Sequence, residues 1–250
     1  MTTPATATFL GVTFHLLTME QAADDILAQG LAPFRYVVTP NVQHMVRILE
    51  QPAKLRPLYE PAWRVLCDSR VLSRLARFDD VRLPVTTGSD LTAHLLGRAA
   101  KQSIPVTVVG PNEEDSARLR QLLPELKFSS YAPPFGFMAN PIEVEKTVRF
   151  VVGANAPLVF LAVGTPQQEM LARRLKEEPG ARGVGLCIGA SIDFLTGKQQ
   201  RAPLWMQRLE LEWLHRLVTN PVRLGHRYFI ECPKIFYFIY RDRRGRQALG

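Results

Sequence analysis

Short apolar runs alternate with helical patterns along the first 200 residues. The runs at 35–39, 104–110, 157–164 and 183–190 are rich in Val, Leu and Ile, which is typical of strands buried on both faces. Three of them meet a turn built from Gly, Pro, Thr or Asn, and a segment with apolar residues at helical spacing follows. Strands that alternate with helices predict a layered α/β fold with a mainly parallel sheet.

The pattern changes near residue 201. From 204 to 218 apolar residues recur every four positions with charged residues between them, which predicts an amphipathic helix that Pro221 ends or bends. Residues 228–240 contain six of the chain's 19 Phe and Tyr residues, and a cluster of Arg follows. We therefore divide the chain into an α/β core at 1–200 and a C-terminal helical appendage at 201–250.

Composition narrows the class of protein. The 250 residues are 46% hydrophobic and 22% charged, which excludes a wholly disordered, collagen-like or coiled-coil chain. No apolar run reaches the roughly 18 residues of a membrane span, and the N-terminus lacks the pattern of a secretory signal, so we expect a cytoplasmic protein. The three cysteines are far apart and odd in number, which argues against a disulfide framework or structural zinc.

Most of the positive charge lies in the appendage. Residues 201–250 contain ten Lys and Arg against four Asp and Glu, so they supply +6 of the chain's net +8. A basic segment favours an acidic partner: phosphate groups, a nucleic acid or an anionic membrane surface. The aromatic stretch is too short to cross a bilayer. It fits either a membrane interface or a helix docked on its own core with a solvated basic end.

Three turns are candidate ligand sites. Ligands of open α/β sheets bind at the carboxyl ends of the strands, where the turns at 39–41, 110–112 and 164–166 are expected. Backbone N–H groups near a helix N-terminus suit a phosphate or a sugar hydroxyl. Simple helix capping explains any one turn equally well, but the three together favour a nucleotide-type ligand. The glycines at 183, 185 and 189 lie within an apolar run, which does not fit a dinucleotide fingerprint.

Three aspartates are candidates for chemistry or for capping. Asp68 follows the strand-like residues 65–67 and is a candidate general base, although a helix N-cap explains it as well. Asp90 begins a helical stretch, and we assign it an N-terminal helix role. Asp193 either holds a sugar hydroxyl or caps a turn. The chain has no DxD, HExxH or GxSxG motif, so metal-bridged or serine chemistry has no signature, and we expect no metal and no cofactor.

Seven blocks resemble, in order, the WecG/TagA/CpsF family of glycosyltransferases (glycosyltransferase family 26). They extend from about residue 36 to residue 228 and read VVTPNVQHM, CDS, TTGSDL, VVG, VGTPQQE, IGASIDFLTGKQQRAPLWMQRLELEWLHRL and NPVRLGHRY. The sixth block is long and highly specific, and the GTPQQE block is fairly specific. The resemblance implies a compact Rossmann-like catalytic core with a basic appendage that closes the active site and contacts the membrane.

The same resemblance implies an activity. Family members move a hexose or N-acetylhexosamine-type sugar from a UDP-sugar to an undecaprenyl-diphosphate-linked saccharide. They act at the inner face of the cytoplasmic membrane, without metal, in cell-surface or exopolysaccharide synthesis, and the reaction inverts to a β-linkage. The implied partners are the donor, the lipid-linked acceptor and the anionic membrane surface, but no nucleic acid. A homo-oligomer is compatible with the sequence, and no residue fixes it.

Site residues carry over from the resemblance by position. It implies Asp68 as the general base and Thr39 as a second catalytic residue that positions the substrate. It also implies substrate contacts at the following residues: Asn41, Gly110, Gly164, Gln168, Asp193, Arg216, Arg223 and Arg227. The three arginines suit a nucleotide diphosphate, because the planar guanidinium pairs well with phosphate. Val85 and His226 stand where many members carry Arg. The donor is therefore open between glucose, N-acetylmannosamine and its uronic acid.

Two other classes of function stand beside this one. A nucleic-acid-binding module would use the basic appendage, but residues 1–200 carry a net charge of only +2. A Rossmann-type oxidoreductase would need its glycines between a strand and a helix, and here they lie inside the strand-like run.

Overall fold

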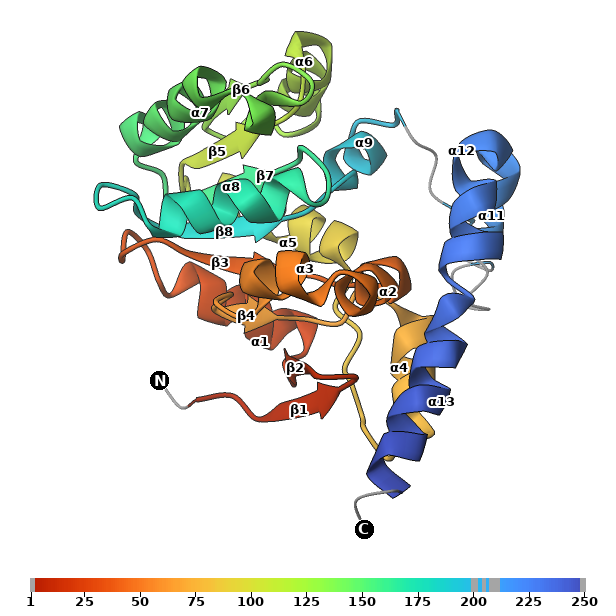
Figure 1. The fold of residues 1–250 in the computed structure, drawn as a ribbon. Coiled ribbons are helices and arrows are strands. Elements are labelled where there is room, and N and C mark those ends of the chain that lie inside the picture. Colours follow the sequence, from red (N-terminus) through yellow and green to blue (C-terminus); the bar gives the residue numbers. More distant parts are fainter. Residues whose placement is uncertain (1–2, 199–201, 204–205, 207–211, 248–250) are drawn as a thin grey trace.

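One six-stranded parallel sheet organises the chain (Figure 1). The computed structural model describes residues 3–198, 202–203, 206 and 212–247. The order across the sheet is β4-β3-β8-β7-β5-β6, and every pair is parallel. Its strands are β3 (Arg35–Val38), β4 (Arg64–Val65), β5 (Val106–Val109), β6 (Phe128–Tyr131), β7 (Leu158–Leu161) and β8 (Val184–Cys187). This confirms the α/β, Rossmann-like expectation.

Helices cover both faces of the sheet and bury one hydrophobic cluster on each. One face carries α2 (Val42–Glu50), α3 (Pro52–Tyr59), α7 (Pro141–Ala154) and α8 (Gln167–Lys176), together with α4 (Arg70–Arg77) beyond the edge of the sheet. The other face carries α1 (Met19–Leu27), α5 (Gly88–Lys101), α6 (Glu113–Leu122) and α9 (Ser191–Leu195). A short 3-10 helix, η1 (Phe137–Ala139), precedes α7. The result is a three-layer sandwich.

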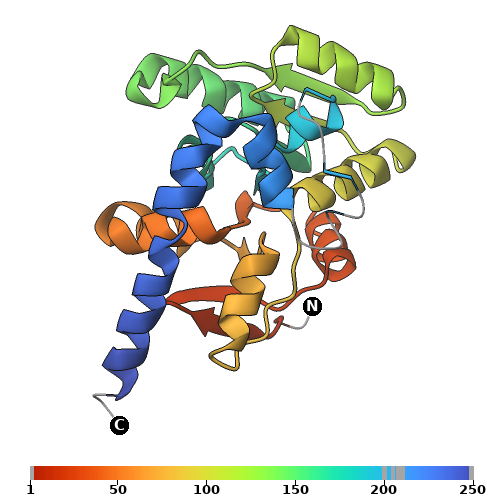
Figure 2. The ribbon, with the colours of Figure 1, turned by 90° about the vertical axis from the view of Figure 1, so that its right-hand side faces the viewer.

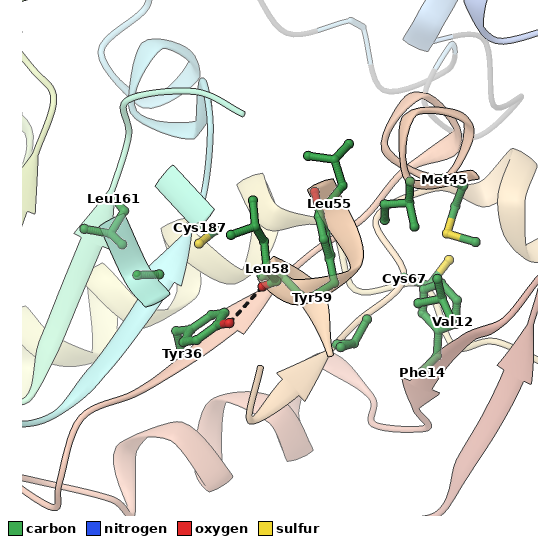
Figure 3. Close-up of a cluster of buried hydrophobic side chains, with 14 of the residues drawn as sticks. Val12, Phe14, Tyr36, Met45, Leu55, Leu58, Tyr59, Cys67, Leu161 and Cys187 are labelled. Atoms are coloured by element: carbon green, nitrogen blue, oxygen red, sulfur yellow. Dashed lines mark hydrogen bonds between the residues drawn. The ribbon is translucent and has the colours of Figure 1, made fainter. Parts of the chain in front are cut away.

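The strands divide their side chains between these layers. In β3, Tyr36 and Val38 join the cluster under α2, α3 and α8, whereas Val37 joins the cluster on the opposite face. Alternation with period two and burial on both faces explain why the run reads as continuously apolar. The buried Tyr36 hydroxyl donates a hydrogen bond of 2.8 Å to the carbonyl oxygen of Leu58 (Figure 3), which satisfies the polar atom of this side chain within the core.

A β-hairpin covers the outer edge of the sheet next to β4. It consists of β1 (Thr6–Phe9) and β2 (Val12–His15), which pair antiparallel. The turn residues Leu10 and Gly11 both have positive φ, at 50° and 72°, as tight hairpin turns require. His15 Nδ1 accepts a hydrogen bond of 3.1 Å from the backbone N–H of Val65, so the edge strand β4 does not present an open ladder there.

The C-terminal segment runs along one side of the core (Figures 1 and 2). It comprises α11 (Glu212–Thr219), α12 (Pro221–His226), the π-helical turn η2 (Arg227–Glu231) and α13 (Lys234–Gln247). The predicted helix at 204–218 overlaps α11 from 212 onward, and its residues 204–205 and 207–211 lie outside the described residues. Pro221 begins α12. In the described part of the chain, no helix is both long and apolar enough to cross a bilayer.

Helix α13 is docked on the core by its inner face. Ile235, Phe238 and Ile239 are at most 7% exposed and belong to the same hydrophobic cluster as α2. Two ion pairs fasten its ends: Lys234 to Glu50 on α2 at 2.6 Å, and Arg243 to Asp79, just after α4, at 2.7 Å. The docked-helix interpretation is therefore confirmed for the inner face. The outer face leaves the aromatic side chains of Phe236, Tyr237 and Tyr240 exposed.

Candidate active site

A cleft of about 820 Å³ lies at the carboxyl ends of β4, β3, β8 and β7, and residues of the C-terminal segment line its opposite wall. Because these four strands are neighbours in the sheet, the loops that follow them meet at one edge. Six of the ten predicted site residues line the cleft: Thr39, Asn41, Asp68, Gly164, Gln168 and Arg227. The sheet order therefore gathers residues that are far apart in the sequence.

The other four predicted residues are not in this lining. Gly110 and Asp193 line a smaller cavity of about 120 Å³ together with Lys198, because β5 lies beyond β7 in the sheet. Arg216 and Arg223 belong to α11 and α12, and their side chains lie outside what the structure describes. Their proposed contacts stay predictions.

Asp68 lies just beyond β4 and lines the cleft. Its Oδ1 accepts a hydrogen bond of 3.2 Å from the backbone N–H of Gly88. The N-cap of α4 is Ser69, whose Oγ accepts a bond of 3.1 Å from the N–H of Leu72. The interpretation of Asp68 as the N-cap of this helix is therefore wrong, because Ser69 is the N-cap of α4. The Asp68 carboxylate instead lines the cleft, with one oxygen oriented by α5.

Gly88 is a site residue that sequence reasoning missed. A Cβ atom built on Gly88 would lie 2.9 Å from Thr39 Oγ1, 3.8 Å from Ser191 Oγ and 3.9 Å from Asp68 Oδ2. The loops after β3, β4 and β8 thus converge on one glycine at the start of α5. The signal that could have identified Gly88 is the TTGSDL block, in which only the aspartate was treated as a candidate. Asp90 has the predicted helix-terminus role, since its N–H donates to the Thr87 Oγ1 cap at 3.1 Å.

Asn41 and Asn112 act as helix caps. Asn41 Oδ1 accepts from the N–H of His44 at 3.3 Å at the start of α2, and Asn112 Oδ1 accepts from the N–H of Asp115 at 2.9 Å at the start of α6. The capping explanation therefore holds for two of the three turns. Asn41 also lines the cleft, so capping fixes its position at the mouth of β3.

Gln168 ties two loops of the site together. Its side chain is 2% exposed, its Oε1 accepts from the N–H of Gly189 at 2.8 Å, and its Nε2 donates to Glu169 Oε1 at 2.8 Å and Thr165 Oγ1 at 3.2 Å. These bonds join the loop after β7 to the loop after β8. They assign Gln168 a positioning role, and its contact with a donor hydroxyl stays a prediction.

A partly buried polar network lies at the loop after β7, and sequence reasoning did not find it. His44 Nε2 lies 3.2 Å from Thr165 Oγ1, which donates to Glu169 Oε1 at 3.0 Å. Burial lowers the pKa of His44 to about 3, assisted by the positive charges of Arg227 and Arg47, so the imidazole is neutral at pH 7. Burial also raises the pKa of Glu169, whose Oε2 has no hydrogen-bond partner among the described residues.

Arg227 brings positive charge to the wall opposite the strand ends. Its side chain lines the cleft, and its buried Nε has no hydrogen-bond partner in the described part of the chain. A donor left in this state suits an anionic ligand that enters the cleft. The neighbouring His226, which stands where the family often has Arg, lies 3.5 Å from Glu231 through its Nδ1.

Glu231 holds this wall against α2. It accepts hydrogen bonds from the Gln43 amide and, at 3.2 Å, from Arg47 Nη2. Partial burial raises the pKa of Glu231, but the bonds from Gln43 and Arg47 and the nearby positive charge outweigh it, so the pKa is lowered overall. The carboxylate is therefore charged at neutral pH and anchors η2 to the helix whose first turn borders the site.

The glycines of the 183–189 run serve packing. Cβ atoms built on Gly183 and Gly185 would lie 2.5 Å from the Ala156 carbonyl oxygen and from the Phe34 ring, respectively. These glycines allow close approach of neighbouring chain segments and do not face a ligand. Gly189 alone lines the cleft, which leaves the dinucleotide interpretation without its glycine-rich turn.

The cleft combines a carboxylate, backbone N–H groups and a guanidinium. A carboxylate can take a proton from a nucleophile, while a guanidinium stabilises an anionic leaving group. Among the residues that the structure describes, no three His, Cys, Asp or Glu side chains gather as a metal site would require.

The family comparison covers nearly the whole molecule. Residues 7–249 match the Glycosyl transferase WecG/TagA/CpsF family, a range that includes every strand of the sheet, the cleft and the C-terminal segment through α13. The sheet, the cleft and the C-terminal segment thus all lie within the region that matches the family. The chain belongs to the WecG/TagA/CpsF family of glycosyltransferases, which transfer sugars in the synthesis of cell-surface polymers.

Proposed function

We propose that this enzyme transfers a hexose or N-acetylhexosamine-type sugar from a UDP-sugar to an undecaprenyl-diphosphate-linked saccharide, with inversion to a β-linkage. The observation that carries the proposal is the grouping of Asp68, Thr39 and Gly88 at the edge of a cleft whose opposite wall contains Arg227. Family membership supports the sugar-transfer chemistry. The proposal assigns the pathway to exopolysaccharide or cell-envelope synthesis.

Asp68 is the proposed general base. Its carboxylate takes the proton of the acceptor hydroxyl as that oxygen attacks the anomeric carbon of the donor sugar. The bond between this carbon and the β-phosphate oxygen of UDP breaks on the opposite face, and UDP leaves with the electron pair. The hydrogen bond from the Gly88 N–H to Asp68 Oδ1 supports the role, because it orients the carboxylate before substrate binds.

The donor occupies the cleft between the β7 and β8 loops and the C-terminal segment. Gly164 and Gln168 lie on the sugar side, and Arg227, with Arg216 and Arg223, pairs with the diphosphate. The Nε of Arg227, which has no hydrogen-bond partner among the described residues, supports this orientation. Gly110 and Asp193 contact the nucleoside from the smaller cavity. No step uses a metal.

The enzyme acts at the inner face of the cytoplasmic membrane, to which it binds peripherally. The exposed aromatic side chains of Phe236, Tyr237 and Tyr240 on α13, and the neighbouring arginines Arg241 and Arg244, support this location. Aromatic residues suit the headgroup boundary and arginine suits anionic lipid. A nucleic-acid partner is not part of the proposal.

The Asp68→Asn variant tests the proposal. We expect UDP to stabilise wild type and variant equally in a thermal-shift assay, while GDP, ADP and NAD do not. We expect the transfer rate to a lipid-linked acceptor to fall about 10²- to 10⁴-fold, the usual contribution of a general base. Asp80→Asn is the matched control: Asp80 is exposed on a turn with φ of 58°, which Asn accepts, and the rate should not change.

Two outcomes contradict the proposal. Transfer by Asp68→Asn at the wild-type rate would remove Asp68 as the base. Stabilisation of the wild type by NAD and not by UDP would favour the hypothesis that the protein is an oxidoreductase.

A further inference from the structure

The cleft is lined both by polar groups and by apolar side chains. The polar groups include those of the β7 and β8 loops, while α4 and α13 contribute four apolar side chains. We name this apolar part the α4–α13 groove, defined by Val71, Leu75, Ile235 and Phe236. Asp68 lies next to it, because α4 begins two residues after Asp68.

Arginines line one side of α4. Arg70, Arg74 and Arg77 follow the spacing i, i+4 and i+7, so they share one exposed face, while Leu72 and Leu75 on the opposite side are buried. Arg70 lines the cleft. Among the residues that the structure describes, no carboxylate forms an ion pair with Arg70. A positive charge thus lies at the entrance of an apolar groove, two residues from the proposed base.

The groove continues onto the molecular surface. Val71 is 40% exposed and Phe236 is 61% exposed, so part of the groove lining lies at the surface. Tyr240, four residues after Phe236 on α13, extends the same face outward and is also exposed. This apolar strip leads from the neighbourhood of Asp68 to the surface that we propose contacts the membrane.

We infer that the α4–α13 groove binds the acceptor's polyprenyl diphosphate: Arg70 pairs with the diphosphate, and Val71, Leu75 and Phe236 contact the first part of the polyprenyl chain. The inference rests on the proposed function, which supplies the lipid-linked acceptor. An anion site followed in space by an apolar strip matches a ligand whose phosphates join a polar sugar to an apolar chain. Bound in this direction, the acceptor presents its sugar hydroxyl to Asp68, while the donor approaches from the β7 and β8 loops.

Calorimetric titration of the full chain with farnesyl diphosphate, at fixed salt and below its critical micelle concentration, tests the groove. We expect tighter binding than for pyrophosphate or farnesol, by at least about tenfold each, because each probe lacks one half of the complementary surface. Arg70→Ala should weaken farnesyl diphosphate binding about 10- to 100-fold and leave UDP binding unchanged. Arg70→Lys should restore part of it, and Val71→Asp should weaken it without lowering the melting temperature.

Arg149→Ala is the control for general loss of positive charge. Arg149 is exposed on α7, whose residues do not line the cleft, and it pairs with Glu145 at 3.0 Å; like Arg70→Ala, its substitution removes one positive charge from the surface. This variant should bind farnesyl diphosphate like the wild type.

Three results would overturn the inference. Pyrophosphate could bind as tightly as farnesyl diphosphate, which would mean that the apolar strip contributes nothing. Arg70→Ala could bind like the wild type. Excess UDP could displace farnesyl diphosphate completely, which would place the probe in the donor site.

These results separate the groove from the proposed function. Arg70-dependent binding of farnesyl diphosphate without transfer from any UDP-sugar would retain the groove and refute the function. Transfer by wild type, with an acceptor KM that Arg70→Ala does not change, would retain the function and refute the groove.

Discussion

Gly88 leaves room for the two residues that the proposed reaction needs most. A methyl group at this position would lie 2.9 Å from Thr39 Oγ1, closer than real Cβ contacts, so Thr39 or the start of α5 must move. The Gly88 N–H also orients Asp68, which makes the carboxylate sensitive to the same movement. Small displacements of a catalytic group are costly, because a shift of about 1 Å can lower the rate about 10²-fold.

We therefore expect Gly88→Ala to lower the transfer rate at least about tenfold without lowering the melting temperature. Alanine is a better helix former than glycine, so α5 itself loses nothing. Gly97→Ala, in the same helix but with no atom within 4 Å of the added Cβ, is the control and should keep full activity. Equal transfer rates for Gly88→Ala and the wild type would show that Thr39 and Asp68 tolerate the methyl group.

His44 makes the stability of the protein depend on pH in a specific direction. Its pKa is lowered from 6.5 to about 3 in the folded protein. Between these values the unfolded chain binds a proton that the folded chain does not, so the free energy of unfolding falls as the pH falls. Within this range the free energy of unfolding falls by at most about 1.4 kcal/mol for each pH unit.

Urea unfolding at pH 7.5 and pH 5.0 measures this effect when the wild type is compared with His44→Gln. The wild type should lose up to about 2 kcal/mol more than the variant between the two pH values, because only the wild type carries the partly buried imidazole with its lowered pKa. Parallel losses would show that His44 is protonated in the folded protein or is accessible to water.

At the scale of elements, α13 is a core helix on one face and a surface helix on the other. Ile235→Ala should lower the free energy of unfolding by about 2–4 kcal/mol, because it leaves a cavity at a side chain that is 1% exposed. Phe236→Ser, one residue on and 61% exposed, should change it by about 0.5 kcal/mol or less. Chemical denaturation of both variants makes the comparison. Equal effects would mean that α13 is not docked as described.

The two sequence interpretations of the aromatic stretch were therefore not exclusive. Apolar residues were too frequent for one buried face, and the excess lies on the outer face of α13. Sequence periodicity alone does not tell which face meets the core, because the partner surface on α2 comes from a distant part of the chain.

At the scale of the whole molecule, the appendage completes the hydrophobic core. Deletion of residues 201–250 would uncover the apolar surface of the core, including that of α2, against which Ile235, Phe238 and Ile239 now pack. We expect the truncated core to fold, to lose transfer and to self-associate, since exposed apolar patches of this kind promote association. Light scattering after size-exclusion chromatography, with the full chain as reference, measures the association. An active, monomeric fragment would contradict this prediction.

The sequence predicted the central strands because their apolar runs are continuous. Strands β3, β5, β7 and β8 lie inside the four predicted runs, and burial on both faces produces that signal. The hairpin and β6 were not predicted. Their strands are partly exposed and contain Thr or Ser between the apolar residues, so they form no continuous apolar run.

The site was predictable where it follows a motif and not where it depends on strand order. Thr39, Asp68 and Gln168 lie in the segments that follow β3, β4 and β7, and all three line the cleft. Gly110 also follows a strand, but β5 lies on the far side of β7, which takes it out of the main cleft. The contacts of Gly88 with Thr39, and of His44 with Thr165, join residues 49 and 121 positions apart, and no local pattern reports them.

Helix α2 links the appendage mechanically to the catalytic edge. Asn41 caps its first turn at the mouth of the cleft, and Gln43 and Arg47 on the same helix hold Glu231 of η2. A helix of nine residues transmits rotation as a stiff lever, because its backbone hydrogen bonds resist bending. A displacement of η2 would therefore either break the Glu231 contacts or turn α2 and move the loop that carries Thr39. While the Glu231 contacts hold, a displacement of η2 therefore also displaces the start of α2, next to Thr39 at the cleft.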